Sequence, residues 1–143
     1  MKKLFLFGIL LSCASLFADG PVWETDLAAA KIRAEKENRT ILLNFTGSDW
    51  CGWCKRLSKE VFNKQEFQTF ASEKLILVEV DFPRHKQISK EQRRKNYELQ
   101  SRHGVQGYPT IMLVDHKEKV LLKTGYLPGG ASSYISHLKD AIN

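Results

Sequence analysis

Three nearly continuous apolar runs lie along the chain between stretches of mixed polarity. They are 40–45 (TILLNF), 75–81 (LILVEVD) and 110–115 (TIMLVD). Runs of this length without regular polar alternation are typical of strands that are buried on both faces of a sheet. A shorter run at 120–124 follows a polar turn at 116–119. The last two runs are therefore predicted to pair as an antiparallel hairpin.

Small and apolar residues recur at helical spacing between these runs. Thr25 is placed to cap a first helix, while Asn63 with Glu66 and Ser89 with Gln92 have the spacing of capping boxes. The predicted helices span 25–38, 54–62, 63–72, 89–103 and 132–142. Strands that alternate with helices and end in a hairpin predict an α/β fold. We expect a central mixed sheet, a C-terminal antiparallel hairpin and helices on both faces.

The first eighteen residues have the layout of a secretory signal peptide. Two lysines precede an apolar run at 4–11, and small residues follow it. The run is too short to cross a bilayer, so export is predicted rather than a transmembrane anchor. We expect cleavage after Ala18, which leaves one domain at 19–143. Alternatively, Leu-Leu-Ser-Cys at 10–13 resembles a bacterial lipoprotein signal and would place a lipid anchor on Cys13.

Composition limits the class of protein. The chain has 143 residues, 43% of them hydrophobic and 27% charged, which fits one globular domain. Its net charge is +6, and loss of residues 1–18 removes two lysines and no acid, leaving 20 basic against 16 acidic residues and a charge of +4. This mild excess is too small to predict nucleic-acid binding.

Two cysteines remain in the predicted domain, Cys51 and Cys54, within FTGSDWCGWCKRL at 45–57. Residues three apart on a helix have Cβ atoms about 5–6 Å apart, whereas a disulfide needs about 3.5–4.5 Å. The pair can close only if Cys51 leaves helical geometry at the helix start, and Gly52 supplies the backbone freedom. A disulfide that closes so small a ring adds little to the stability of the fold. It is better suited to reversible oxidation and reduction.

Other roles for the pair are less well supported by the sequence. Zinc would need two more ligands, but the four histidines have no paired spacing and there is no second cysteine pair. Haem attachment would need a histidine directly after Cys54, where Lys55 stands. A static structural disulfide stays open as an alternative.

The thiolate is the reactive form of cysteine, so the motif must lower a thiol pKa. A change from about 8.5 to about 7 needs roughly 2 kcal/mol, of which a helix dipole supplies about 0.3–1 kcal/mol. The rest would come from backbone N–H groups, the second thiol, and Lys55 and Arg56. We therefore assign Cys51, at the helix end, as the nucleophile and Cys54, one turn in, as the resolving thiol.

The two tryptophans of the motif have different expectations. Trp50 could pack under the loop or line a protein-binding surface. Trp53, between the cysteines, is expected to be exposed and to face substrate, because aromatic anchors suit interfaces. A second candidate segment is HGVQGYPTIML at 103–113. Pro109 precedes a buried strand and cannot donate to its ladder, so Tyr108–Pro109 is expected in a turn or a cis bond.

These two segments together resemble the thioredoxin superfamily over roughly residues 25–143. The resemblance rests on WCGWCK at 50–55 after a buried strand, GYPT at 107–110 before the next, and Gly125 after the hairpin. The phrases FTGSDWCGWCK, VEVDFP and EQRRKNYELQ are similar to the small bacterial periplasmic thiol:disulfide oxidoreductases labelled DsbH.

The resemblance implies a thioredoxin-like three-layer fold in which Cys51 attacks and Cys54 resolves. It further implies that Pro109 is cis and faces the cysteine pair with Tyr108 beside it, where the backbone pairs with an extended substrate segment. Thioredoxins commonly carry a buried aspartate on the strand before the motif, but the matching residue here is Asn44. Asparagine cannot act as a base, so proton transfer must use water or another group.

The function expected from this sequence is reduction or rearrangement of disulfides in exported proteins, in the periplasm or another extracytoplasmic compartment. The Cys51–Cys54 disulfide would be the only redox centre, since no flavin or nicotinamide motif is visible. Electrons would then come from another protein, and a membrane protein is the expected donor. Two alternatives stay open: a redox-inert thioredoxin-like binding module for extended segments, and a net oxidant of exported thiols.

Overall fold

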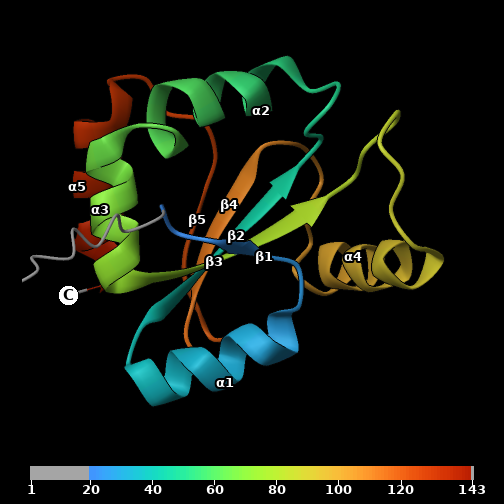
Figure 1. Ribbon diagram of the computed structural model, residues 1–143, viewed down its shortest axis with the longest axis horizontal. Helices are drawn as coiled ribbons and strands as arrows, with labels where there is room; N and C mark the ends of the chain where they lie inside the picture. The colour runs from blue at the N-terminus through green and yellow to red at the C-terminus, as the bar shows by residue number, and fades with distance from the viewer. Residues whose placement is uncertain (1–19, 143) are drawn as a thin grey trace, which may run out of the picture.

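A mixed five-stranded sheet forms the centre of the protein, in a computed structural model that describes residues 20–142 (Figure 1). The strands are β1 (Trp23–Glu24), β2 (Thr40–Thr46), β3 (Leu75–Asp81), β4 (Thr110–Val114) and β5 (Val120–Thr124), in the order β1-β3-β2-β4-β5. β1, β3 and β2 are parallel, whereas β4 is antiparallel to both β2 and β5. The predicted hairpin is confirmed. The expected signal peptide and Cys13 lie outside the described residues.

Helices cover both faces of this sheet, which confirms the α/β three-layer prediction. They are α1 (Leu27–Glu37), α2 (Gly52–Leu57), the π-helical turn η1 (Ser58–Phe62), α3 (Gln65–Lys74), α4 (Lys90–Arg102) and α5 (Gly130–Ile142). The helices α1 and α4 lie on one face of the sheet, and α3 and α5 lie on the other (Figure 1). Side chains of α1 and α4 join one core cluster, and those of η1, α3 and α5 join the other. None of the helices within residues 20–142 is long and apolar enough to cross a bilayer.

Two predicted helix starts are wrong. Asp26, not Thr25, caps α1, because its carboxylate accepts from the amides of Ala28 and Ala29 at 2.8 and 3.2 Å. Asn63 does not cap α3, because its own amide still donates to the Ser58 carbonyl as the last turn of η1. Each predicted cap was one residue before the observed N-cap, and the N-cap of α3, Lys64, makes no side-chain capping bond.

Other boundaries differ in smaller ways. The capping oxygen of Ser89 accepts from the amide of Gln92 at 3.0 Å, as predicted. The single helix predicted at 54–62 begins at Gly52 and changes to a π turn at Ser58. α5 begins two residues before the predicted Ser132. β1 was not predicted, because two residues are too few to show an apolar pattern.

The two faces of β2 and β3 differ in polarity. Toward α1 and α4 both strands are apolar along their whole length: Ile41, Leu43, Phe45, Ile76, Val78 and Val80. Toward α2 and α3 the face begins with Leu42 and Leu77 in the core and becomes polar at the carboxyl ends of the strands, with Asn44, Thr46, Glu79 and Asp81. Because side chains alternate along a strand, these four polar residues share one face.

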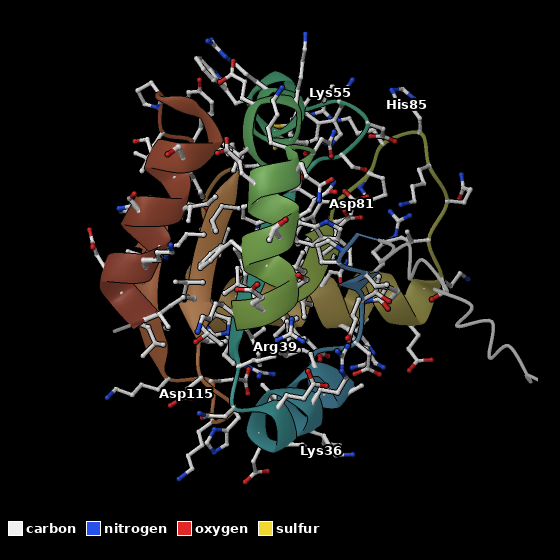
Figure 2. The ribbon with its side chains drawn as sticks, turned by 60° about the vertical axis from the view of Figure 1, so that its left-hand side comes forward. Lys36, Arg39, Lys55, Asp81, His85 and Asp115 are labelled. Atoms are coloured by element: carbon white, nitrogen blue, oxygen red, sulfur yellow. A yellow bond between two sulfur atoms is a disulfide. The ribbon has the colours of Figure 1, made fainter. Side chains whose placement is uncertain are left out.

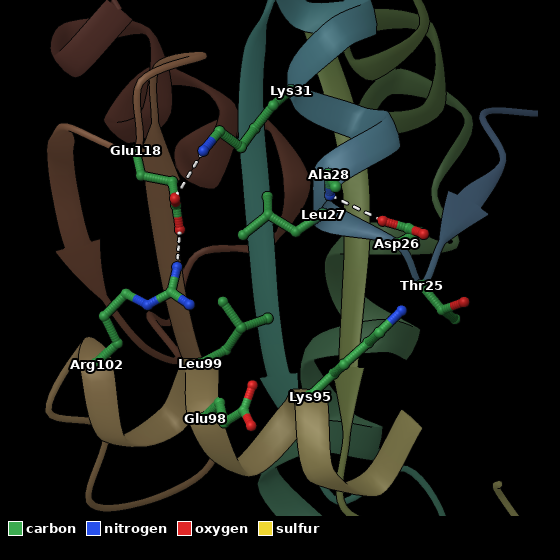
Figure 3. A pocket seen from close by; sticks show the side chains of 10 residues that line it. All are labelled: Thr25, Asp26, Leu27, Ala28, Lys31, Lys95, Glu98, Leu99, Arg102 and Glu118. Atoms are coloured by element: carbon green, nitrogen blue, oxygen red, sulfur yellow. Dashed lines mark hydrogen bonds and ion pairs between the residues drawn. The ribbon is translucent and has the colours of Figure 1, made fainter. Parts of the chain in front are cut away.

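A cleft of about 250 Å³ lies between α1 and α4 (Figure 3). Lys31 and Arg102 both bind the Glu118 carboxylate, at 2.8 and 2.7 Å, and so fasten the β4–β5 turn to the two helices. Burial alone would raise the pKa of Glu118, but its hydrogen bond to Lys31 and the charges of Lys31 and Arg102 lower it. The Glu118 carboxylate at the centre of the cleft is already paired with two cations, so we assign this cleft a structural role.

Candidate active site

The cysteine pair lies where the loop after β2 enters α2. Cys51 is the N-cap of α2, with extended backbone (φ −81°, ψ 110°), and Cys54 lies one turn into the helix. The two residues form a disulfide with their Cα atoms 5.2 Å apart. Cys51 leaves helical geometry, as the disulfide spacing requires. Both cysteines are largely covered, with 6% of Cys51 and 3% of Cys54 exposed.

The surroundings of the two sulfur atoms are unequal. The amide of Cys54 donates to Sγ of Cys51 at 3.2 Å, so Cys51 occupies the position of a capping oxygen at the helix start. A thiolate at this position would accept the same hydrogen bond and face the positive end of the helix, both of which favour the charged form. The Cys51 sulfur is therefore the better placed of the two to carry negative charge.

Two carboxylates fasten the loop that precedes the motif to the chain after β3. Asp49 accepts from the amides of residues 84, 85 and 86 at 2.9, 2.7 and 2.7 Å. Asp81 accepts from the amide and the hydroxyl of Ser48 at 2.9 and 2.5 Å. Hydrogen bonds from the amides of Arg84, Lys86 and His85 lower the pKa of Asp49 to about 2. The two carboxylates thus hold the loop before the motif beside the end of β3 and the chain that follows it.

The lowered pKa of Asp49 predicts a pH dependence. A carboxyl group whose pKa falls on folding stabilises the fold fully above its ordinary pKa of about 3.8, and this contribution is lost as the pH falls toward 2. Asp49→Asn should therefore lose stability relative to wild type at pH 7, and the difference should shrink near pH 2. Urea unfolding across this range measures it, with Asp140→Asn on the exposed face of α5 as the control. An equal difference at both pH values would refute the assignment.

Trp50 packs against the loop after β3 and is half-buried. Its Nε1–H donates to the Phe82 carbonyl at 2.8 Å, and the Arg84 guanidinium carbon lies 3.9 Å from the ring centroid. Its ring also meets Tyr108 edge to face, with centroids 6.0 Å apart. Trp50 thus links the residue before Cys51 to the loop on the far side of the site.

Gly47 leaves room for that indole. A Cβ built on Gly47 would overlap Cε2 and Nε1 of Trp50, whereas a Cβ on Gly52 would meet nothing within 4 Å. We expect Gly47→Ala to cost about 1–3 kcal/mol, the usual cost of overpacking, because the hydrogen-bonded ring cannot move freely. Gly52→Ala is the matched control and should be neutral in denaturant unfolding. Equal unfolding free energies for the two variants would contradict this account.

The Tyr108–Pro109 segment lies across from the disulfide. Its peptide bond is cis, as the resemblance implies, and the Tyr108 carbonyl oxygen lies 3.7 Å from Sγ of Cys51. The Tyr108 ring stacks on Phe82 and its hydroxyl donates to Gln100 at 2.6 Å. Gly125 follows the hairpin. A Cβ at this position would come within 3.1 Å of the Pro109 carbonyl oxygen, so the close approach favours glycine. The structure therefore brings together the two segments that the sequence singled out.

Comparison with known proteins agrees with this geometry. Residues 27–140 match the family described as the thioredoxin-like domain. The chain belongs to the thioredoxin-like family. It is 39% identical over 120 residues to the disulfide bond reductase DsbH of Chlamydia pneumoniae. These aligned residues are 84% of this chain and 72% of that protein. A solved structure of a DsbH oxidoreductase superimposes with a TM-score of 0.83 at 36% identity, covering 96% of this chain and 94% of the other.

A second relative is longer than this chain. The thioredoxin-related protein DsbJ of Chlamydia pneumoniae is 30% identical over 108 residues, which are 76% of this chain and 31% of that protein.

This protein is a disulfide oxidoreductase. It has the thioredoxin-like fold and the cysteine pair, and it is similar to a named disulfide bond reductase.

Trp53 in this thioredoxin-like domain is 55% exposed, as expected, but it is not isolated. Its ring lies 5.1 Å from that of Tyr126, and the Arg56 guanidinium sits over both rings at 5.4 and 5.3 Å. Glu60 accepts from the Tyr126 hydroxyl at 2.7 Å and pairs with Arg56 at the same distance. Tyr126 was missed by sequence reasoning; its position directly after Gly125 was the available signal.

An aromatic cavity of about 300 Å³ lies next to Trp50 and Tyr108. It is lined by Trp50, Asp81, Phe82, Pro83, Arg84, Ile88, Arg93, Tyr97 and Tyr108. Phe82 stands between Tyr97 and Tyr108 in this group, with ring centroids 5.2 and 5.1 Å away. One aromatic cluster thus contains Trp53, between the two cysteines, and the other contains Trp50, directly before Cys51.

No group of three or more His, Cys, Asp or Glu side chains within residues 20–142 is arranged to hold a metal ion. Lys55 is exposed next to Cys54 and lies at the same end of the molecule as Asp81 and His85, with Lys36 and Asp115 at the opposite end (Figure 2).

Proposed function

We propose that this protein is an exported reductase of disulfides in other exported proteins, acting in the periplasm or an equivalent compartment. The observation that carries the proposal is the Cys51–Cys54 disulfide at the start of α2, facing the Tyr108–Pro109 segment at 3.7 Å. Similarity to a named disulfide bond reductase favours the reducing direction over net oxidation. The signal-like residues 1–18 support export.

In the proposed cycle, electrons pass to the client through the two thiols of Cys51 and Cys54. The Cys51 thiolate attacks one sulfur of a client disulfide, and the client's other sulfur leaves as a thiol. The Cys54 thiolate then attacks Cys51 Sγ and releases the second client thiol. The client gains two electrons and two protons, and Cys51 and Cys54 end as a disulfide. Lys55, Gly52 and the two tryptophans are assigned to tuning this exchange and to client contact.

A client segment is proposed to bind at the Tyr108–Pro109 backbone in extended form. Main-chain pairing supplies affinity without demanding a particular sequence, which suits an enzyme with several clients. Trp53 on one side and Trp50 on the other would contact the residues that flank the client cysteine. Electrons to restore the dithiol are proposed to come from a membrane protein with its own cysteine pair.

The reduction potential of the Cys51–Cys54 couple tests the direction. Equilibration with a glutathione buffer and thiol labelling gives the oxidised fraction at each ratio. A reductase should have a potential in the range of thioredoxin, about −270 mV, or of the glutaredoxins, about −200 to −230 mV. A value near the about −120 mV of a strong disulfide-forming oxidant would overturn the reducing direction.

A further inference from the structure

A polar cavity of about 200 Å³ lies next to the buried cysteine of the pair. Its walls come from β2, the loop after it, α2, η1 and β3: Asn44, Thr46, Ser48, Cys54, Lys55, Ser58 and Glu79. A water molecule occupies about 30 Å³ of liquid and needs two to four polar partners. The cavity therefore has both the room and the polar groups to hold water between its walls.

Cys54 needs a proton acceptor in this place. Its thiol must lose a proton before it can attack, and only 3% of the residue is exposed to bulk solvent. Its own amide donates to Cys51, which assists the other sulfur. Among the side chains that line the cavity, the amide, hydroxyl and ammonium groups cannot take up a proton near neutral pH. The carboxylate of Glu79 can.

Glu79 reaches the cavity because of strand alternation. It is the direct partner of Asn44 across the β2–β3 ladder. It also lies on the same face of β3 as the core residue Leu77, two residues earlier. The Glu79 side chain is 28% exposed, and the Lys86 ammonium lies 3.9 Å from its carboxylate. Placing a carboxylate on the covered face of a central strand costs desolvation free energy, so we expect Glu79 to have a functional role there.

The charged neighbours of Glu79 come from three segments. Burial raises the pKa of Glu79, Asp81 on the same strand raises it further, and Lys86 from the loop after β3 opposes both. Lys55 of α2 lines the same cavity. The net upward shift brings this carboxyl group closer to the pKa of a thiol, which makes it a stronger base than an ordinary glutamate.

We propose that the Glu79 carboxylate accepts the proton of the Cys54 thiol, through water in this cavity, when Cys54 resolves the mixed disulfide. This inference deepens the proposed function and rests on it. The Cys54 S–H bond breaks as its proton passes to Glu79, the new thiolate forms the bond to Cys51 Sγ, and the client sulfur leaves with the electron pair. When a donor later reduces the Cys51–Cys54 disulfide, the same carboxyl returns its proton to Cys54.

The two thiol steps can be timed separately with dithiobis(nitrobenzoate) as the client. Attack by Cys51 on this aromatic disulfide releases one coloured thiolate, and resolution by Cys54 releases a second. Stopped-flow mixing of the reduced full-length protein should thus show two phases. In Glu79→Gln the second phase should slow at least about tenfold, since a positioned base typically contributes 10²–10⁴-fold. The first phase should be unchanged.

The pH profile of the second phase separates a base from a merely structural group. With Glu79 as the base, the wild-type rate should level off above the pKa of Glu79. Without it, as in Glu79→Gln, the rate should rise in proportion to hydroxide until Cys54 itself ionises. Glu79→Asp should recover part of the rate, and Glu73→Gln, on the exposed face of α3, is the matched control with both phases expected to be normal.

A thiol titration supplies an independent readout. In a Cys51→Ser background, Glu79→Gln should lower the pKa of Cys54, because a nearby negative charge has been removed, even though resolution becomes slower. An unchanged second phase in Glu79→Gln overturns the inference, as does a wild-type second phase that rises with hydroxide throughout; the latter decides the matter even if the variant does not fold. Absence of the first phase in wild type would instead refute the proposed function.

Discussion

Cys51→Ser is expected to reduce client disulfides no faster than the assay mixture without protein. A hydroxyl group is not ionised near neutral pH, so the attack that opens the client disulfide is lost entirely. Turbidity of insulin during disulfide reduction, with a small dithiol as the electron source, measures the rate. Lys59→Ala, exposed on η1, is the control and should retain the wild-type rate.

The same variant distinguishes an enzyme from a binding module. If the protein only gripped extended segments beside Pro109, Cys51→Ser would bind clients and suppress their aggregation as well as wild type does, and wild type would not accelerate reduction. Equal reduction rates for wild type and Cys51→Ser would contradict the redox account.

Leu57→Ala is expected to destabilise the oxidised protein by about 2–5 kcal/mol, the usual cost of opening a cavity in a core. Leu57 is fully buried at the end of α2 and belongs to the core cluster beneath η1 and α3. It is the side chain that fastens the motif helix to the sheet. Guanidinium unfolding followed by circular dichroism measures the loss.

The control for this core substitution is again Lys59→Ala, which should change stability by no more than about 0.5 kcal/mol. Because Leu57 anchors the helix that carries Cys54, the variant should also reduce clients more slowly at temperatures where it is still folded. A Leu57→Ala protein as stable as Lys59→Ala would mean that α2 is held by the loop anchors at Asp49 and Asp81 rather than by its buried face.

The central strands were predictable because their signal is local. β3 has the predicted bounds, and β2 and β4 differ from prediction by one residue at one end. A strand buried on both faces shows a continuous apolar run whatever its neighbours are. The helix starts near Thr25 and Asn63 were not predictable to the residue, because the backbone geometry selects the neighbouring Asp26 as the cap of α1 and leaves α3 without a capping side chain.

The active site was predictable in its motif residues and not in its surroundings. The cysteine pair and the Tyr108–Pro109 segment each have a sequence pattern, and the resemblance joined them. Glu79 and Phe82 lie in the VEVDFP phrase and Tyr126 follows Gly125, but no sequence pattern places these three side chains at the site. Their positions depend on the β2–β3 register and on packing between segments distant in the chain. LILVEVD shows that Glu79 and Asp81 share a face, but only the tertiary structure shows that α2 covers it.

The replaced aspartate illustrates the same limit. Sequence reasoning identified Asn44 as a residue that could not transfer a proton and left the acceptor open between water and another group. The register places Glu79 directly beside Asn44, on the neighbouring strand and in the same cavity as Cys54. Asn44 and Glu79 are neighbours because β2 and β3 pair, and the sequence of β2 alone does not show that a carboxylate of β3 lies beside Asn44.

Trapping of mixed disulfides by Cys54→Ser tests the central claim most directly. Without its resolving thiol, the enzyme should remain joined to clients through Cys51, and purification from the native compartment under acid quench should yield covalent complexes that a small thiol reductant dissolves. The matched control is Cys51→Ser/Cys54→Ser, which should yield none. Complexes are predicted with exported disulfide-containing proteins; their absence in Cys54→Ser, or equal amounts with the double variant, would contradict the account.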